Sequence, residues 1–336
     1  HYTAPIGNAE LKKVIAEKVA RFNGIPADPQ RNIIITPGSD SALFFSLIPF
    51  VEHGDEVMIV DPSYPNNFQA VEILGGVPVS VPVRPETGFE LEIEEFERRL
   101  TDKTKLVILT NPNNPTTVVY SRKSLEQLAA FIIKHDLLAI VDQAFEDIVY
   151  DGREMVSLGS LDGMLQKTVT IFSISKGMGL SGFRVGCIVA SDRLIDTLFA
   201  SAVSVVGATN TAAQLAAIAA YGKRDELIAE YSAIFDRRRR FVYEALSNIP
   251  GVRMQMPQSA FLSWIDVSQL GTSDEIVDYL VRKAKVFVNS GYCYGNQGEG
   301  FIRLVQGCYA DDADIEQAVL RIREALLKKS RELGIS

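Results

Sequence analysis

A lysine placed just after an apolar segment is the first residue whose position suggests chemistry. Residues 168–172 are apolar and β-branched, as in a strand buried on both faces, and Lys176 follows four residues later. Poor solvation at such a strand end disfavours the ammonium form and leaves an amine that can act as a nucleophile. Ser173, Ser175 and Arg184 supply hydroxyls and a guanidinium suited to a phosphate. An amine that can form a Schiff base beside a phosphate site suggests pyridoxal phosphate (PLP) as cofactor.

A second candidate phosphate site follows the short apolar segment 32–36. There the sequence T-P-G-S-D-S leads into a helical pattern over 42–50. A strand that feeds a helix through a glycine presents free backbone N–H groups to an anion, so the amides of Ser39 and Asp40 are candidate phosphate ligands. A plain turn with a serine or aspartate as helix N-cap explains the same residues.

Four further side chains are placed where ligands bind in α/β proteins. Tyr64, Asn114 and Asp142 each come soon after an apolar segment that predicts a buried strand. Tyr64 suits stacking on a flat ring, and Asn114 can both donate and accept hydrogen bonds. Asp142 is costly to bury unless it meets a cation such as a protonated pyridine nitrogen, although it also suits a helix cap. Arg303 lies in the middle of a predicted strand, where its planar fork suits a carboxylate.

Strand and helix patterns alternate from about 32 to 189, which predicts a mostly parallel sheet between two layers of helices and one ligand crevice. We expect strands at 32–36, 56–60, 75–83, 106–110, 137–141 and 168–172, with helices at 9–22, 42–50, 93–100 and 121–135. A long charged helix over 224–246 contains Arg237 to Arg240, which we expect on its solvated face. The segments 251–267, 275–284, 286–289, 301–306 and 314–333 predict strand, helix, strand, strand and helix of a smaller α+β domain.

The domain organisation that we predict therefore has three parts. Residues 1–28 form an N-terminal segment, 29–223 the large cofactor-binding domain, and 224–336 the interdomain helix with the small domain. The chain begins at His1 without an initiator methionine, so we expect an N-terminal piece to be missing.

Composition restricts the partners that this chain can have. The 336 residues carry 34 Lys and Arg against 42 Asp and Glu, a net charge of −8, so no basic field exists to gather nucleic acid or anionic lipid. The longest apolar helical run, 211–221, is too short to span a bilayer. Three cysteines and three histidines without ligand spacing predict no metal site, and the sparse cysteines suggest a reducing, cytoplasmic location.

Seven short motifs occur along the chain, and their order and spacing are informative together. They read G-S-D-S, D-P-S-Y, N-P-N-N-P-T, I-V-D-Q-A-F, S-I-S-K, G-L-S-G-F-R-V-G and G-F-I-R-L. Together they resemble, over essentially the whole chain, the class I/II aminotransferases, which are PLP enzymes of fold type I. Within this family, the motif sequences are most similar to those of histidinol-phosphate aminotransferases and their relatives.

The resemblance assigns a role to each candidate residue. It implies that Lys176 holds PLP as a Schiff base and moves the substrate proton, while Asp142 pairs with the pyridine nitrogen. It implies further that Asn114 bonds the ring oxygen, that Tyr64 stacks on the ring, and that Arg303 binds the substrate carboxylate. For the cofactor phosphate it implies Ser39, Asp40, Ser173, Arg184 and, from the neighbouring subunit, Tyr2. A homodimer with shared active sites, acting on an amino acid and a 2-oxo acid, is therefore expected.

Some residues depart from the family pattern. Phe145 replaces a tyrosine whose hydroxyl bonds the ring oxygen, so we expect a higher Schiff-base pKa. Gln143 and Thr117 replace the more usual Glu and Gly. Asn289 stands where histidinol-phosphate enzymes tend to carry an arginine, and the run near Val205 is apolar where aspartate enzymes place one. These two positions favour a neutral or apolar amino acid.

Two alternatives to transamination stay open at this point. The same scaffold supports other PLP reactions, such as a C–S β-lyase or an amino-acid-phosphate decarboxylase, because the orientation of the bound substrate decides which bond breaks. A non-catalytic effector domain of a regulator is the second alternative. It would need a DNA-binding module, which is not visible in these residues and which the missing N-terminal piece would have to carry.

Overall fold

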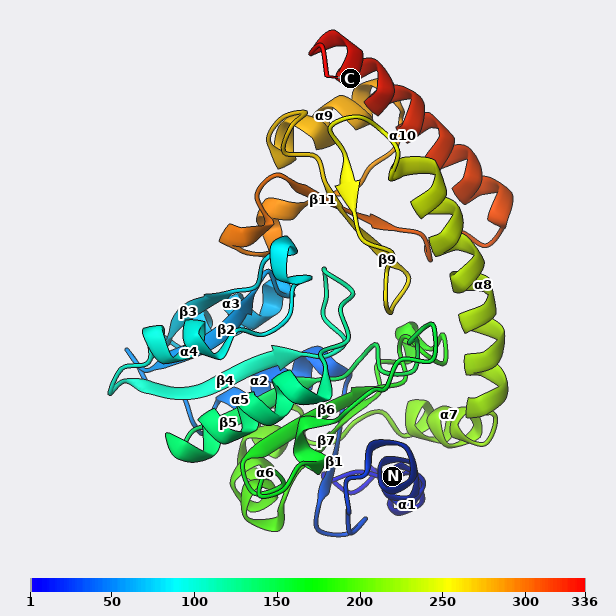
Figure 1. Cartoon of the computed structure of the whole chain (residues 1–336). Helices are drawn as coiled ribbons and strands as arrows, with labels where there is room; N and C mark the ends of the chain where they lie inside the picture. Colours follow the sequence, from blue (N-terminus) through cyan, green and yellow to red (C-terminus); the bar gives the residue numbers. More distant parts are fainter. Residues whose placement is uncertain (1, 336) are drawn as a thin grey trace.

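The computed structural model describes residues 2–335; His1 and Ser336, the ends of the first and last predicted domains, lie outside this range. Figure 1 shows a large domain, a small domain above it, and the long helix α8 along one side of both. Each domain is built on one sheet, of seven and of four strands. The α/β fold with a smaller C-terminal domain is therefore confirmed, while the boundaries 1–28, 29–223 and 224–336 stay a prediction.

The sheet of the large domain has the order β1-β7-β6-β5-β4-β2-β3. Its strands are β1 (Ile33–Thr36), β2 (Glu56–Asp61), β3 (Val77–Pro82), β4 (Thr104–Thr110), β5 (Leu138–Asp142), β6 (Thr168–Ser173) and β7 (Gly186–Val189). The pairs β3–β2, β2–β4, β4–β5 and β5–β6 are parallel, and β7 runs antiparallel to both of its neighbours. Because parallel strands end at the same edge, the residues that follow β2, β4, β5 and β6 meet there.

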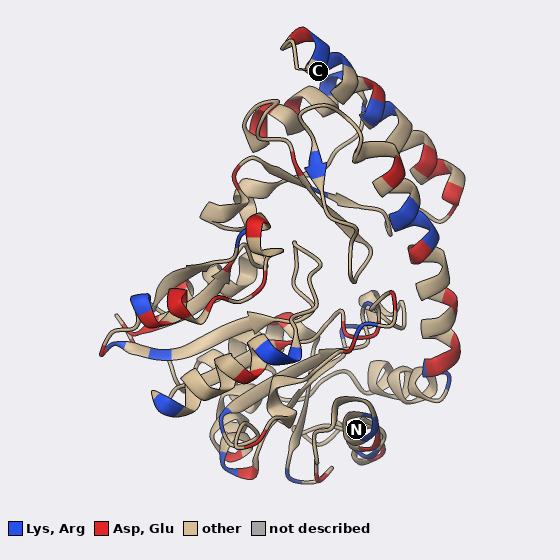
Figure 2. Cartoon of the chain, in the orientation of Figure 1, with Lys and Arg blue, Asp and Glu red and all other residues tan. Residues whose placement is uncertain are grey.

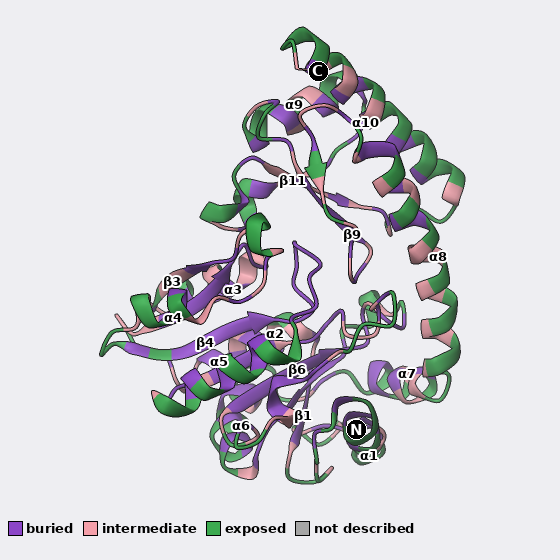
Figure 3. Ribbon diagram, in the orientation of Figure 1, coloured by how far each residue is buried: buried purple, intermediate pink, exposed green. Residues whose placement is uncertain are grey.

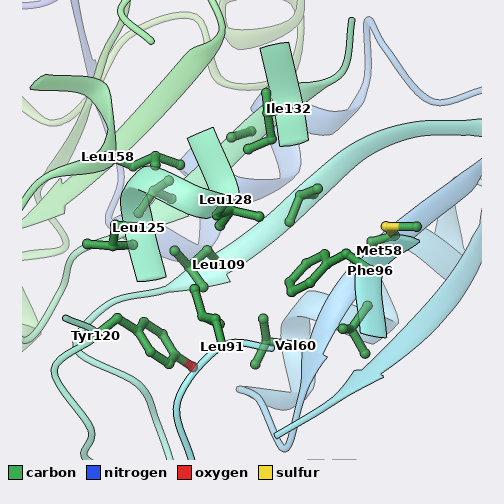
Figure 4. Packing of buried hydrophobic residues seen from close by; sticks show 14 of the residues in the cluster. Met58, Val60, Leu91, Phe96, Leu109, Tyr120, Leu125, Leu128, Ile132 and Leu158 are labelled. Carbon is green, nitrogen blue, oxygen red and sulfur yellow. The ribbon is translucent and has the colours of Figure 1, made fainter. Parts of the chain in front are cut away.

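Helices cover both faces of this sheet. They are α1 (Ala9–Asn23), α2 (Ser39–Leu47), α3 (Pro65–Ile73), α4 (Ile93–Arg99), α5 (Arg122–Lys134), α6 (Asp192–Val206) and α7 (Thr211–Tyr221). Apolar residues of β2, β4 and β5 alternate in direction, so one set packs against α4 and α5 and the other against α2, α3 and α6. Figure 4 shows the first set, in which Met58, Leu109, Phe96 and Leu128 belong to one cluster of buried apolar residues.

The small domain packs one sheet face on three helices. Its antiparallel strands β8 (Arg253–Met254), β9 (Leu262–Asp266), β10 (Asn289–Ser290) and β11 (Phe301–Val305) have the order β10-β11-β9-β8. The helices are α8 (Arg224–Leu246), α9 (Ser273–Lys283) and α10 (Asp312–Glu332). Ile265, Ile302 and Leu304 face these helices, whereas the alternate residues Trp264 and Arg303 face the large domain. Short 3-10 turns complete the chain at Pro85–Thr87, Leu158–Ser160, Ser181–Phe183, Gly291–Tyr294 and Asn296–Gly298.

The two domains are joined by more than α8. The backbone N–H of Tyr150 donates to the carbonyl of Gln258 at 3.0 Å, and the N–H of Ala260 donates to the carbonyl of Ile148 at 2.8 Å. These two bonds connect residues 148–150 of the large domain to residues 258–260, which lead into β9. No helix of the described residues is both long enough and apolar enough to cross a membrane.

The expectation for the arginine run of α8 is wrong in part. Arg238 and Arg239 are 4% and 0% exposed, and only Arg237 and Arg240 lie at the surface. The guanidinium of Arg239 pairs with Asp236 at 2.6 Å and donates to the carbonyl of Pro257 at 2.7 Å. Charged side chains are buried only with such partners, which the sequence does not show. Figures 2 and 3 show the mixed charge and mixed burial along α8.

Other differences concern element ends and short elements. Helix α2 begins at Ser39, three residues before the predicted start, and the expected strand 251–267 is two strands with a turn between them. The expected strand 286–289 reduces to β10, and α3 and α6 were not predicted. Pro65 and the polar pair after it concealed α3, since proline suits the first turn of a helix but breaks one elsewhere.

Candidate active site

A cavity of about 260 Å³ opens at the carboxyl edge of the large sheet, beneath the small domain. The register places Thr110 of β4 beside Asp142 of β5, and Asp142 beside Ile171 of β6, so the loops after these strands converge. Most of the predicted site residues line the cavity: Ser39, Asp40, Tyr64, Asn114, Asp142, Lys176, Arg184 and Arg303. Two others do not, and they are described below.

The amine of Lys176 lies in a poorly solvated part of the cavity. Its Nζ is 5.8 Å from the centre of the Phe145 ring and 5.9 Å from that of Phe261. Burial lowers the pKa of Lys176 below its ordinary value, and the carboxylates of Asp40 and Asp142 only partly oppose this. A lowered pKa increases the fraction of neutral amine, which is the form that can attack a carbonyl or accept a proton.

The carboxyl group of Asp142 lies in the same cavity and accepts a hydrogen bond from the backbone N–H of Ala144 at 2.9 Å. The pKa of Asp142 is raised to about 6, chiefly by burial and to a smaller extent by Asp40, while the Ala144 bond and Lys176 act in the opposite direction. A carboxylate held in this way gains from a cationic partner, because the partner offsets the lost solvation.

Arg184 and the start of α2 form a cradle with the shape and charge for an anion. The guanidinium of Arg184 lies 3.5 Å from the Ser175 hydroxyl and 3.4 Å from an Asp40 carboxylate oxygen. Gly38 allows this approach, since a Cβ atom there would lie 2.3 Å from Arg184 Nη2. A Cβ atom on Gly186 would likewise lie 2.9 Å from the backbone nitrogen of Ser39. The cradle therefore needs both glycines and offers the first N–H groups of a helix.

Arg303 is held in a fixed orientation on the small-domain side of the cavity. Its two terminal nitrogens donate to the side-chain oxygens of Asn114 and Asn289, each at 2.9 Å. Its Nε is buried and has no hydrogen-bond partner among the described residues. Burial also lowers the pKa of Arg303. A buried guanidinium with an unused donor is suited to a carboxylate.

Tyr64 stands at the start of α3 and is half-buried beside the cradle. Its hydroxyl accepts a hydrogen bond from the Asn66 amide at 3.3 Å. Burial, with the nearby carboxylates of Asp40 and Asp142, raises the pKa of Tyr64 to about 12, so the phenol stays neutral.

Two predicted residues do not line the cavity. Ser173 is buried behind it, and its hydroxyl accepts the backbone N–H of Ser175 at 3.1 Å, so the hydroxyl in the wall is that of Ser175. Tyr2 is 99% exposed and lies beside residues 208–211. Sequence reasoning missed Phe261 and Val305, and the alternation Arg303 to Val305 along β11 was the signal for the latter.

The structure also places the residues that depart from the family pattern. Thr117 has a φ of 67°, in the left-handed region that glycine adopts most readily. Gln143 is buried outside the cavity wall, where its amide donates to the Ser157 hydroxyl at 3.0 Å. Asn289 holds Arg303 as described, and Val205 is exposed on α6. In residues 2–335 no cluster of three or more His, Cys, Asp or Glu could hold a metal ion.

Comparison with known proteins decides the family. The model for "Aminotransferase class I and II" matches residues 1–322 of this chain. The chain belongs to the class I and II aminotransferases. The family membership accounts for the motif order and for the arrangement of charged groups around one cavity.

Similar aminotransferases come from archaea. Aromatic-amino-acid aminotransferase 2 of Thermococcus litoralis is 34% identical over 335 residues, which is 98% of this chain and 85% of that protein. An aspartate aminotransferase of Pyrococcus abyssi is 34% identical over 335 residues, with the same coverage. The crystal structure of an aromatic aminotransferase from Pyrococcus horikoshii superposes with a TM-score of 0.94 at 33% identity, covering 99% of this chain and 88% of that one.

Proposed function

We propose that this aminotransferase binds PLP at Lys176 and moves an amino group between an amino acid and a 2-oxo acid. One observation carries the proposal: an amine with a lowered pKa, a buried carboxyl group and an anion cradle share one cavity. The cradle supports the fit to PLP independently of the family, because the guanidinium of Arg184 lies beside the Ser175 hydroxyl and the first residues of α2, which suits a phosphate.

The described residues offer a partner for each polar group of PLP. The amides of Ser39 and Asp40, the hydroxyl of Ser175 and the guanidinium of Arg184 would hold the phosphate. Asp142 would pair with the pyridine nitrogen. Ser173 would act on the phosphate only through Ser175, a narrower role than the one predicted.

Two more side chains would hold the ring itself. Tyr64 would stack on its face, and the Asn114 amide nitrogen would donate to the ring oxygen while its Oδ1 stays with Arg303. When bound, PLP supplies an aldehyde for the lysine amine and a sink for electrons from the substrate.

The protein's own groups carry the remaining steps. The neutral amine of Lys176 would accept the proton from the substrate Cα as general base, and the ammonium so formed would give the proton back as general acid. Arg303 would bind the substrate carboxylate and so hold the substrate in the cavity. Phe145 and Phe261 exclude water around the amine, which keeps its pKa low.

Charge in the cavity supports a neutral or apolar amino donor. Among the described residues, the cations of the wall are Lys176, Arg184 and Arg303, and each already has a proposed partner. This chain therefore offers no further cation to a side-chain carboxylate.

We also propose a homodimer in the cytoplasm. The fully exposed ring of Tyr2 and the exposed Val205 and Val206 of α6 support a subunit contact on that face. The unpaired state of Cys187, Cys293 and Cys308 supports a reducing compartment.

A donor panel with spectroscopic detection tests the reaction. The PLP-loaded protein would be mixed with single L-amino acids, including phenylalanine, leucine, alanine and aspartate, and then with 2-oxo acids. Near-stoichiometric pyridoxamine phosphate followed by regeneration of PLP supports transamination. Release of pyruvate and thiol, or of CO2, without pyridoxamine phosphate would instead establish a lyase or decarboxylase, and no reaction with any donor would refute catalysis.

A further inference from the structure

One buried carboxylate near the cavity has no part in the chemistry described above. Asp61 ends β2 and is 0% exposed. Its oxygens accept the backbone N–H of Asn296 and of Gln297, each at 3.1 Å, and the hydroxyl of Ser80 at 2.5 Å. Two of its three partners therefore belong to the small domain.

The small-domain segment bound in this way is the loop 291–298, which fits tightly against the large domain. Gly295 has a φ of 119°, and a Cβ atom there would lie 2.1 Å from an Asp61 oxygen. The backbone N–H of Ser63 donates to the carbonyl of Tyr294 at 2.8 Å. The loop is thus bonded both to Asp61 and to the segment that leads into Tyr64.

The same loop carries the ring that supports Arg303. Tyr294 is 3% exposed, and the centre of its ring lies 4.8 Å from the Arg303 guanidinium carbon. The ring also packs edge-on against Trp264 at 5.7 Å between centres, and Trp264 is the cross-strand neighbour of Arg303. An aromatic face on a guanidinium is an attractive contact that restrains the orientation of the planar group.

We propose that Asp61 is a positioning residue for the reaction: by fixing the loop 291–298 to the end of β2, it holds Tyr294 under Arg303 and so aims the guanidinium at the substrate carboxylate. The inference rests on the proposed role of Arg303 as the carboxylate site. Burial raises the pKa of Asp61, and the three hydrogen bonds that it accepts oppose this. These bonds compensate the carboxylate for its lost solvation.

Substitution Asp61→Asn tests the inference. Asparagine keeps the shape of the side chain but replaces one acceptor oxygen by an NH2 group that faces a backbone N–H. The loop therefore loses one hydrogen bond to the end of β2 and is held less firmly in place. We expect KM for the best donor of the panel above to rise about tenfold while kcat changes less than about twofold. The dissociation constant of the carboxamide of the same amino acid should stay unchanged, because it lacks the charge that Arg303 reads. Equal losses for acid and carboxamide would overturn the proposal.

Fluorescence gives a readout that does not depend on turnover. Trp264 is the only tryptophan of the chain, so its emission reports whether Tyr294 stays packed against it. We expect a red-shifted emission in Asp61→Asn and no shift in Asp102→Asn, which removes the same charge from an exposed turn without hydrogen-bond or ion-pair partners among the described residues. A wild-type spectrum in Asp61→Asn would contradict the anchor.

A second variant keeps the test valid if Asp61→Asn does not fold. Gly295→Ala breaks the same contact from the loop side, and we expect the same carboxylate-specific rise in KM, without additivity in the double variant. Arg303→Gln separates the two proposals. If Arg303→Gln weakens binding of the acid no more than binding of the carboxamide, the proposed carboxylate site fails; if it weakens binding of the acid selectively and neither anchor variant does, only the positioning role fails.

Discussion

Asp142→Asn is predicted to stabilise the cofactor-free protein while it removes activity. The two side chains have the same shape, and an asparagine oxygen still accepts the N–H of Ala144. The change therefore removes a charge and leaves the contact geometry in place. Residues that are kept for function commonly lower stability in this way.

The magnitude follows from the pKa of Asp142. Burial raises it from the ordinary 3.8 to about 6, so the folded state keeps a proton that the unfolded state releases between these values. Stability therefore falls as the pH rises through this window, and above it the ionised carboxylate costs about 3 kcal/mol. Asparagine avoids this cost, so its advantage should be about 3 kcal/mol at pH 7.5 and about half of that at pH 5.

Urea unfolding of both cofactor-free proteins at the two pH values measures this advantage. Addition of PLP should reverse the order, because a ligand stabilises the protein that binds it more tightly, and Asp142 would supply the partner of the pyridine nitrogen. An asparagine variant that is less stable at pH 7.5, or whose advantage does not change between pH 5 and 7.5, would refute the reasoning.

Three further predictions concern Lys176, Phe145 and the buried arginine of α8. Lys176→Ala should lose the visible absorption band of bound PLP and at least about 10²–10⁴-fold in kcat, and a variant that kept both would exclude Lys176 as the reactive amine. Phe145→Tyr adds a hydroxyl beside the amine and should lower, by about one pH unit, the midpoint of the absorbance titration of bound PLP; an unchanged midpoint would disprove the assignment. Arg239→Ala should lower the free energy of unfolding by about 3–5 kcal/mol, against about 0–1 kcal/mol for the half-exposed Arg240→Ala, which shares Asp236 and Asp151 as partners; equal losses in urea unfolding would contradict this.

Much of the large domain was predictable because its signals are local. Segments such as 106–110 and 137–141 are apolar throughout and end in polar residues, and parallel strands must bring those ends together. That rule alone gathers Asn114, Asp142 and Lys176 at one edge. The roles of these residues stay predictions, because no bound molecule tests them.

What could not be predicted depends on contacts between distant segments. The burial of Arg239 depends on Asp151, 88 residues away, and on a carbonyl of the chain that enters β9. Likewise the choice of Ser175 over Ser173 in the cavity wall depends on how the turn after β6 bends toward Arg184. Neither contact leaves a periodic pattern in the sequence.

The backbone hydrogen bonds between residues 148–150 and 258–260 have a consequence for protein engineering. A hybrid enzyme that took residues 224–336 from a relative would receive a foreign partner for Ile148 and Tyr150, next to Phe145. The exchange therefore requires the donor's own 148–151 segment as well, since Asp151 bonds Arg239, which lies in the replaced segment. Grafts cut only at the start of α8 should therefore yield poorly folded protein, whereas two-segment grafts should restore yield.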